Sequence, residues 1–263
     1  PADQFAEGIT WFLKTRKLGH RLDLTFEMLR QSDAVGRITN LIATHTTKAI
    51  EKAVLVKEDF IADMFQKGTL TAGDADFFDG TFPNETDPNP KFIYDGQPWF
   101  DTTHGLSVGA STFSNHTVSA ALNQNNLEAQ DTLMSVTSAV DERGERITNR
   151  PDTLLVPTGA LAFTASVLLE TLLKPNSVNN DINTVQGKYR LIEWAALDDA
   201  ASASSWWLGN SRNFGLRIRD SGAPRIGTFI DEKKEVVSVK WVTRFGAQVT
   251  DWRGWSNANK AAS

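Results

Sequence analysis

Apolar and polar residues alternate in two stretches near the start of the chain, residues 9–13 and 20–28. Strict alternation over such lengths is typical of β-strands with one buried face. A short polar segment that ends at Gly19 separates them, which predicts a β-hairpin with a basic tip. Two strands alone are marginally stable in water, so we expect this hairpin to pack on another surface.

A second pattern, with apolar residues at three- and four-residue steps, runs from Ala34 to Phe65. This spacing predicts one amphipathic helix of roughly 34 residues, which would be about 50 Å long. Ser32 or Asp33 is a candidate N-cap, and Gly68 is a candidate left-handed C-cap. The steps do not keep a strict heptad, so we expect one helix face to pack across a sheet.

The rest of the chain mixes helices and strands. Residues 68–105 are rich in turn-forming residues but carry many aromatic side chains, which predicts an ordered loop with short strands. The patterns that follow predict helices over 127–141 and 159–173, a buried strand over Leu154–Val156, and strands over 189–197, 206–209, 214–219, 226–230 and 235–252.

Six of the eight tryptophans follow residue 190. Trp194 and Trp241 fall on predicted strands and are expected to point inward. Trp206 and Trp207 are neighbours on one strand, so they must point to opposite faces. We therefore expect one of them to meet a second layer or a neighbouring subunit, because tryptophan is enriched at interfaces.

Composition narrows the classes of function. The chain has 263 residues, a formal net charge of −5 and no cysteine. A net negative chain is not expected to bind nucleic acid through its overall charge, although a local basic patch remains compatible with it. The lack of cysteine excludes disulfides, thiolate zinc sites and cysteine nucleophiles. The same lack makes the cytoplasm the expected setting for assembly. No apolar run approaches a membrane span of ~18 residues.

Motifs for catalysis are missing from the sequence. The signatures of serine hydrolases, P-loop proteins and dinucleotide-binding folds do not occur. An acidic turn over 73–80 has partial EF-hand spacing, but Phe78 stands at a ligand position and Gly80 comes one residue late. For His104, we expect a local structural hydrogen bond. We predict no catalytic, metal or cofactor site.

Several phrases in a fixed order resemble the major capsid protein of tailed bacteriophages. The main ones are PDTLLVPTGALAFTASVLL at 151–169, Trp206-Trp207-Leu208, and RFGAQVTDW at 244–252. Weaker ones lie upstream, at Glu27-Met28-Leu29 with Asp33, at Gly96–Phe100 with His104, and at Leu127–Gly144. Together they cover nearly the whole chain.

The resemblance implies an α+β fold with an extended hairpin loop, a long spine helix, a peripheral domain and an axial domain. On this sequence an N-terminal remnant and the hairpin loop would occupy 1–30, and the peripheral domain with the spine helix 31–147. The axial domain would occupy 148–238, and 239–263 would return to the peripheral domain.

The function implied by the resemblance is self-assembly of a major capsid protein into an icosahedral shell around the phage genome, without enzymatic activity or cofactor. Its partners would be copies of itself in hexamers and pentamers, and it would enclose double-stranded DNA without sequence-specific binding. Portal, scaffold and decoration proteins are further expected partners. The protein would reside in the virion and assemble in the host cytoplasm, with no membrane.

Two regions are candidate inter-subunit contacts. One is the basic hairpin tip with Lys14, Arg16, Lys17 and Arg21, and the other is the loop 176–187 with Asn179, Asn180 and Asp181. Three alternatives stay open. An encapsulin nanocompartment would share the fold and enclose protein cargo, a carbohydrate-binding β-module would explain the tryptophans, and an enzyme with an unseen site ranks third.

Overall fold

A computed structural model describes residues 13, 15–27, 34–70, 95, 97–106, 111–175, 181–198, 204–220, 222 and 225–258, without the side chains of Arg16 and of 34–42. The chain divides into two compact units. Unit 1 comprises Pro1–Trp11, Ala62–Arg217 and Gln248–Ser263, and unit 2 comprises Phe12–Ile61 and Ile218–Ala247.

Unit 2 is built on a long twisted sheet. Its strands are β1 (Arg16–Thr25), β8 (Leu216–Asp220), β9 (Arg225–Asp231) and β10 (Val236–Val249). The order is β1-β10-β8, and β9 also pairs with β10. All ten residues of β1 pair antiparallel with β10, from Arg16 opposite Phe245 to Thr25 opposite Val236.

This pairing corrects the predicted hairpin. Lys17 and Gly19, expected at the tip of a turn, lie inside β1 and face Arg244 and Val242 of β10. The predicted first strand, 9–13, lies outside the described residues except for Leu13. Alternation identifies a strand and its two faces, but it carries no information about the partner, which here is more than 200 residues away along the chain.

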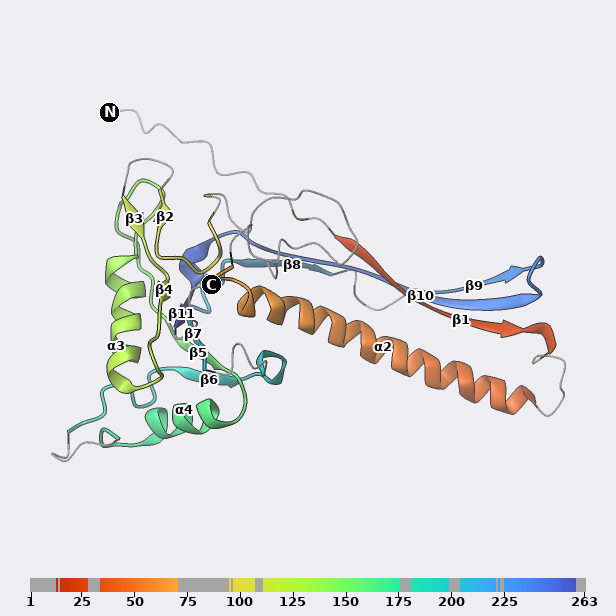
Figure 1. Cartoon of the computed structure of the whole chain (residues 1–263), viewed down its shortest axis with the longest axis horizontal. Helices are drawn as coiled ribbons and strands as arrows, with labels where there is room; N and C mark the ends of the chain where they lie inside the picture. The colour runs from red at the N-terminus through yellow and green to blue at the C-terminus, as the bar shows by residue number, and fades with distance from the viewer. Residues whose placement is uncertain are drawn as a thin grey trace. The chain divides into compact units, whose positions relative to one another are not determined.

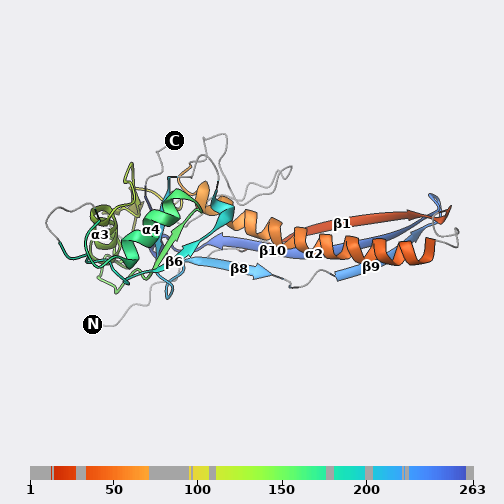
Figure 2. The ribbon, with the colours of Figure 1, turned by 90° about the horizontal axis from the view of Figure 1, so that it is seen from below.

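The long helix is confirmed as α2 (Ala34–Gln66), with 33 residues. Within unit 2 it runs along one face of the sheet (Figures 1 and 2). Ala49 packs there with Val239 and Trp241 of β10. Phe60 meets Phe245 edge to face, with ring centroids 5.6 Å apart. The predicted packing of one helix face on a sheet is therefore confirmed.

Gly68 does not have the predicted left-handed conformation, because its φ is not positive. A Cβ at this position would lie 2.6 Å from Cδ2 of Phe100 and 2.8 Å from the carbonyl oxygen of Met64. Residue 68, the second after the end of α2, is glycine because the chain there comes too close to Phe100 for any side chain.

Unit 1 is built on a five-stranded sheet in the order β4-β11-β7-β5-β6. The strands are β4 (His116–Thr117), β11 (Trp255–Ala258), β7 (Trp206–Gly209), β5 (Thr153–Val156) and β6 (Arg190–Glu193). The accompanying helices are α3 (Gln124–Thr132), the π-helical turn η1 (Leu133–Thr137), α4 (Ala160–Glu170), and the 3₁₀ turns η2 (Ala195–Leu197) and η3 (Trp252–Gly254). A small pair, β2 (His104–Gly105) and β3 (Thr112–Phe113), completes the unit.

The predicted helices and strands of this unit are present, with shifted ends. The helix expected from 127 begins at Gln124, where the Asn123 side chain accepts a hydrogen bond from the backbone N–H of Asn126. The strand expected to reach residue 197 ends at Glu193, because a 3₁₀ turn follows at Ala195–Leu197.

Trp206 and Trp207 point to opposite faces of the central strand β7, and both are fully buried. Trp206 joins the core cluster that contains Leu154 and Leu208, and its indole N–H donates to the carbonyl of Ala120 at 2.9 Å. Trp207 meets Phe65 edge to face at 6.0 Å. The second layer that covers them therefore comes from the same chain. Trp241 is buried as predicted, whereas Trp194 is half-buried.

Candidate inter-subunit surfaces

The sheet of unit 2 presents a face rich in basic residues on the side away from α2. Side chains alternate along each strand, so cross-strand partners share a face. Lys17 pairs with Arg244, Arg21 with Lys240, and Val242 with Arg225. We call the part of this surface over β1, β9 and β10 the basic sheet face; its charged members are Lys17, Arg21, Asp23, Arg225, Asp231, Lys240 and Arg244.

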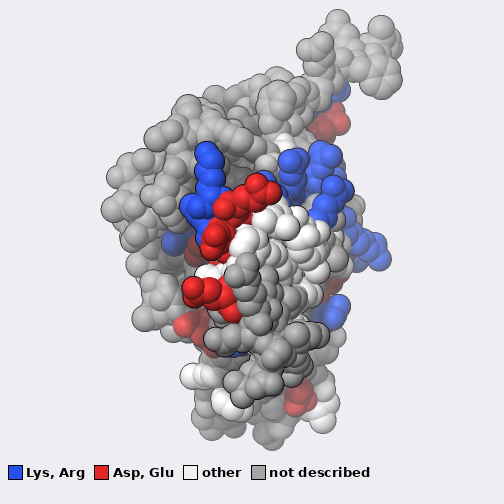
Figure 3. Space-filling model, turned by 90° about the vertical axis from the view of Figure 1, so that its right-hand side faces the viewer, with Lys and Arg blue, Asp and Glu red and all other residues white. Residues whose placement is uncertain are grey.

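A groove crosses this face. It is lined by Lys17, Arg225, Gly227, Lys240 and Arg244, among others. Gly227 adds no side chain to the groove, and a Cβ at this position would lie 3.3 Å from Cε of Lys240. In the end-on view of Figure 3, lysine and arginine side chains lie on both sides of a central band of carboxylates.

Contacts within the face hold some of these cations in place. Arg21 pairs with Asp23, which also accepts a hydrogen bond from Ser238 at 2.6 Å. The hydrogen bond from Arg21, followed by that from Ser238, lowers the pKa of Asp23, so this carboxylate stays charged. Arg21 and Lys240 both lie over the ring of Phe229, at 5.0 and 5.4 Å from its centroid.

Other cations of the face are not neutralised locally. Among the described residues, no carboxylate pairs with Lys17, Arg225 or Lys240. Five basic and two acidic side chains give the face a net charge of 5 − 2 = +3. A protein of net charge −5 thus carries a local positive surface on unit 2.

Unit 1 carries an exposed apolar surface on α4 and the segment after it. Phe163, Leu172 and Ile182 are 75%, 71% and 78% exposed. Val167 and Leu173 lie beside them and are about half exposed. We call these five residues the apolar α4 patch. Exposed apolar clusters of this kind mark interaction sites in soluble proteins.

The backbone beneath this patch is well fixed. Leu173 and Ile182 form an antiparallel bridge, and the N–H of Lys174 donates to the carbonyl of Asp181 at 2.8 Å. The buried amide of Asn183 donates to the carbonyls of Leu168 and Thr171 at 2.6 and 2.8 Å. The exposed side chains are therefore held outward by a hydrogen-bonded scaffold.

His104 is buried in a polar cluster, as its predicted structural role requires. Its Nε2 lies 3.0 Å from Oδ1 of Asn115 and its Nδ1 lies 2.7 Å from Asp95. Oδ1 of Asn115 can only accept, because the amide nitrogen already donates to backbone carbonyls, so Nε2 of His104 carries a hydrogen. The ring stacks on Trp252 at 4.6 Å. The expected structural hydrogen bond is confirmed.

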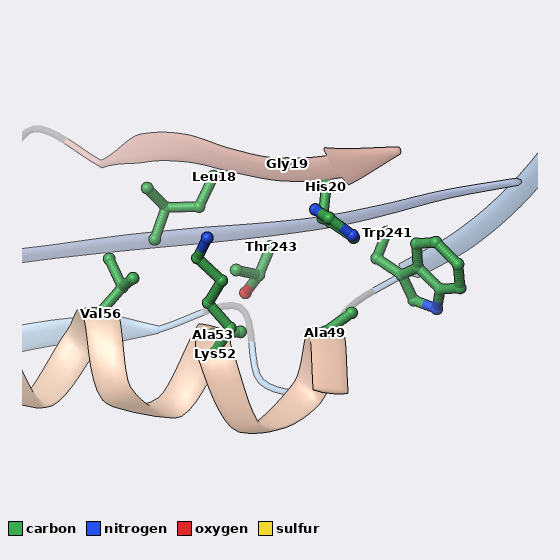
Figure 4. Close-up of a pocket in the computed structure, with 9 residues that line it drawn as sticks. All are labelled: Leu18, Gly19, His20, Ala49, Lys52, Ala53, Val56, Trp241 and Thr243. Carbon is green, nitrogen blue, oxygen red and sulfur yellow. The ribbon is translucent and has the colours of Figure 1, made fainter. Parts of the chain in front are cut away.

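A small pocket lies between α2 and the sheet of unit 2 (Figure 4). Leu18, Ala53 and Val56 make most of its walls apolar, and Lys52 reaches into it from the helix. His20 lies at its other end, against Trp241. No group of three or more metal-binding side chains exists among the described residues. The pocket is a gap in the packing between the sheet and the part of α2 that carries the small side chains of Ala49 and Ala53.

The candidate contact residues fall into three groups. Lys17 and Arg21 lie on the basic sheet face, and Arg16 begins β1. Asp181 is exposed beside the apolar α4 patch. The other three candidates, Lys14, Asn179 and Asn180, lie outside the described residues. The predicted acidic turn 73–80 lies outside them too.

The sequence reasoning missed the basic residues of β9 and β10 and the apolar α4 patch. Lys240 and Arg244 lie four residues apart on a strand that the sequence predicts. Only the pairing of this strand, β10, with β1 brings them beside Arg21 and Lys17. Phe163 and Leu172 were included in a helix predicted to reach residue 173, whereas α4 ends at Glu170.

The described part of the chain contains no helix with the length and apolar character that crossing a membrane requires.

Comparison with known proteins gives one family. The sequence profile of the phage capsid protein family matches residues 12–257. No curated protein matches the sequence significantly.

Similar solved structures include a chain from Mycobacterium phage Patience, with 16% identity, coverage of 100% of this chain and 76% of that one, and a TM-score of 0.48. Another is the capsid of an empty GTA particle, with 12% identity, coverage of 100% and 81%, and a TM-score of 0.43. A holo-encapsulin complex from Synechococcus elongatus has 10% identity, coverage of 95% and 75%, and a TM-score of 0.45.

Proposed function

The chain belongs to the phage capsid protein family, and we propose that its copies join through two surfaces, the basic sheet face and the apolar α4 patch. It is a major capsid protein of a tailed bacteriophage, a structural protein that self-assembles into the shell of the virion. The proposal concerns which surfaces make the contacts and what the shell encloses.

The apolar α4 patch supports the proposal most directly. Phe163, Leu172 and Ile182 expose most of their side chains although hydrogen bonds fix the backbone around them. Covering each such side chain contributes about 1.5–3 kcal/mol. The patch and the basic sheet face differ in chemistry, which suits heterologous contacts, in which one surface of a copy meets another surface of the next and the ring closes.

The finer assignments follow from family membership and remain proposals. Rings of six and five copies would bring the loop 176–187 to their axes, with an axial domain over 148–238 and a peripheral domain over 31–147 and 239–263. The shell would enclose double-stranded DNA without reading its sequence. Portal, scaffold and decoration proteins would complete the particle, which would assemble in the host cytoplasm, and the chain would have no catalytic activity.

The test of shell formation is electron microscopy of the purified protein, with and without nuclease treatment. We expect closed shells of uniform size. Encapsidated nucleic acid would support a genome-enclosing capsid, whereas shells that contain protein cargo and no nucleic acid would favour an encapsulin. Dispersed protein with no closed particles would contradict the proposal.

Phe163→Asp tests the contact itself. Phe163 is largely exposed, so the substitution should leave the fold and the circular dichroism spectrum unchanged. It should abolish shells, because a carboxylate would be buried without a partner at the contact. Phe163→Leu, the matched control, keeps an apolar side chain and should still assemble. Normal shells from Phe163→Asp would exclude the α4 patch from the interface.

A further inference from the structure

The basic sheet face carries more positive charge than its own carboxylates neutralise. Its net charge is +3, and Lys17, Arg225 and Lys240 have no carboxylate partner among the described residues. Like charges held this close repel one another, so a bound anion would stabilise the face. The groove between these side chains, with Gly227 in its lining, provides room for one.

A matching charge is present in the same sequence. Residues 68–90 contain five carboxylates and no lysine, arginine or histidine. The five are Asp74, Asp76, Asp79, Glu85 and Asp87. This segment alone accounts for the net charge of −5, since the remaining residues sum to −5 − (−5) = 0.

We propose that the basic sheet face of one copy binds the acidic segment 74–87 of a second copy. The inference rests on the proposed function, because a shell requires a contact in which two different surfaces of neighbouring copies meet. Opposite charges on these two surfaces would steer the copies together and set the register of the contact.

Two observations favour a protein segment over nucleic acid as the occupant. Asp23 and Asp231 lie on the same face, and their carboxylates would repel phosphates. Serine, threonine and amide groups of a peptide segment could hydrogen-bond to such carboxylates, whereas a phosphate backbone offers only acceptors there. The chain as a whole is also negative, which disfavours approach to DNA.

A peptide-binding measurement tests the contact without requiring shells. A fluorescently tagged peptide of residues 72–89 would be titrated with full-length protein, with and without Arg225→Glu/Lys240→Glu. All proteins in this measurement carry Phe163→Asp, which keeps copies apart and leaves the basic sheet face open to the peptide. We expect the variant to bind about tenfold more weakly or worse, because attraction becomes repulsion. The control is Arg150→Glu/Arg190→Glu, which reverses two exposed charges on unit 1 and should leave binding unchanged. Equal binding with and without Arg225→Glu/Lys240→Glu would overturn the proposal.

A charge-swap experiment tests whether the contact joins two copies. Arg225→Glu/Lys240→Glu and Asp74→Lys/Asp79→Lys should each reduce the yield of sedimenting shells about tenfold or more. A mixture of the two variants should give more shells than either variant alone, because a reversed face meets a complementary segment wherever the two kinds of copy are neighbours. Recovery only when all four substitutions share one chain would place the contact within a copy and overturn the proposal. Full assembly of the first variant with less encapsidated nucleic acid would instead identify a nucleic-acid surface.

The peptide-binding measurement tests the docking surface, whereas shell formation by the wild-type protein tests the proposed function. If wild-type protein forms no shells but the peptide binds as expected, the proposed function fails and the docking surface stands. If wild-type and charge-reversed proteins form shells equally well, the docking surface is wrong and the capsid function stands.

Discussion

At the scale of single residues, one buried amide connects several segments of unit 1. Asn115 directs its side-chain nitrogen at the carbonyl oxygens of Trp99, Trp252 and Trp255, at 2.7, 3.0 and 3.1 Å. Its Oδ1 accepts from the backbone N–H of Asp101 at 2.9 Å and from His104. These segments lie far apart in the sequence, so the amide fixes their relative position beside the pairing of β4 with β11.

Replacing this amide should be costly. Asn115→Ala would remove the hydrogen bonds that this amide donates to three backbone carbonyls and the partner of Nε2 of His104, and each unsatisfied buried group costs about 1–3 kcal/mol. We expect an overall loss of roughly 3 kcal/mol, measured as a lower urea midpoint of unfolding followed by tryptophan fluorescence. Asn125→Ala, at an exposed position that accepts one bond from Lys174, is the control and should change stability by less than about 0.5 kcal/mol. Equal midpoints for the two variants would show that the cluster contributes little.

Single residues were predictable where local chemistry decides their role. The structural hydrogen bond of His104 followed from a histidine in a turn-rich, aromatic segment. Gly68 was correctly predicted near the end of a helix, but the predicted reason was wrong. A glycine just after a helical pattern looks the same in the sequence whether it supplies a left-handed conformation or leaves room for Phe100. Distinguishing them requires the tertiary contact.

At the scale of elements, α2 shows what periodicity can establish. Its 33 residues were predicted nearly to the residue, because a three- and four-residue rhythm over nine turns leaves no competing interpretation. The partner of β1 was not predicted, since pairing over ten residues with β10 depends on long-range packing. The same limit hid the basic sheet face, whose charges come from three strands.

Because α2 packs on the sheet of unit 2, breaking it should disrupt the unit. Thr46→Pro, in the first half of the helix, removes a backbone hydrogen bond and clashes with the preceding turn, which costs about 3 kcal/mol or more. We expect insoluble or unassembled protein and a lower melting temperature by differential scanning fluorimetry. Thr47→Ala is the adjacent control; it removes only an exposed side-chain bond to Ala43 and improves helix propensity. A Thr46→Pro protein with normal shells and unchanged melting would mean that the continuous helix is dispensable.

At the scale of the whole molecule, the two units expose surfaces of different kinds. Unit 1 presents apolar side chains on a fixed scaffold, and unit 2 presents a face of net charge +3. Apolar contacts contribute most of the free energy of association, whereas charged ones mainly set its specificity and rate. Assembly should therefore weaken at high ionic strength without disappearing, because salt screens only the charged contact.

The same division of roles predicts that the subunit has no stable monomeric state under native conditions. A 29.0 kDa chain that leaves Phe163, Leu172 and Ile182 largely exposed gains free energy whenever another copy covers them. Static light scattering at micromolar concentration should give a mass many times that of one chain, at both low and high salt. Phe163→Asp should remain small and folded under the same conditions, which separates association from misfolding. A compact wild-type particle of subunit mass would show that the exposed apolar side chains are tolerated in water and are not the surface that drives assembly.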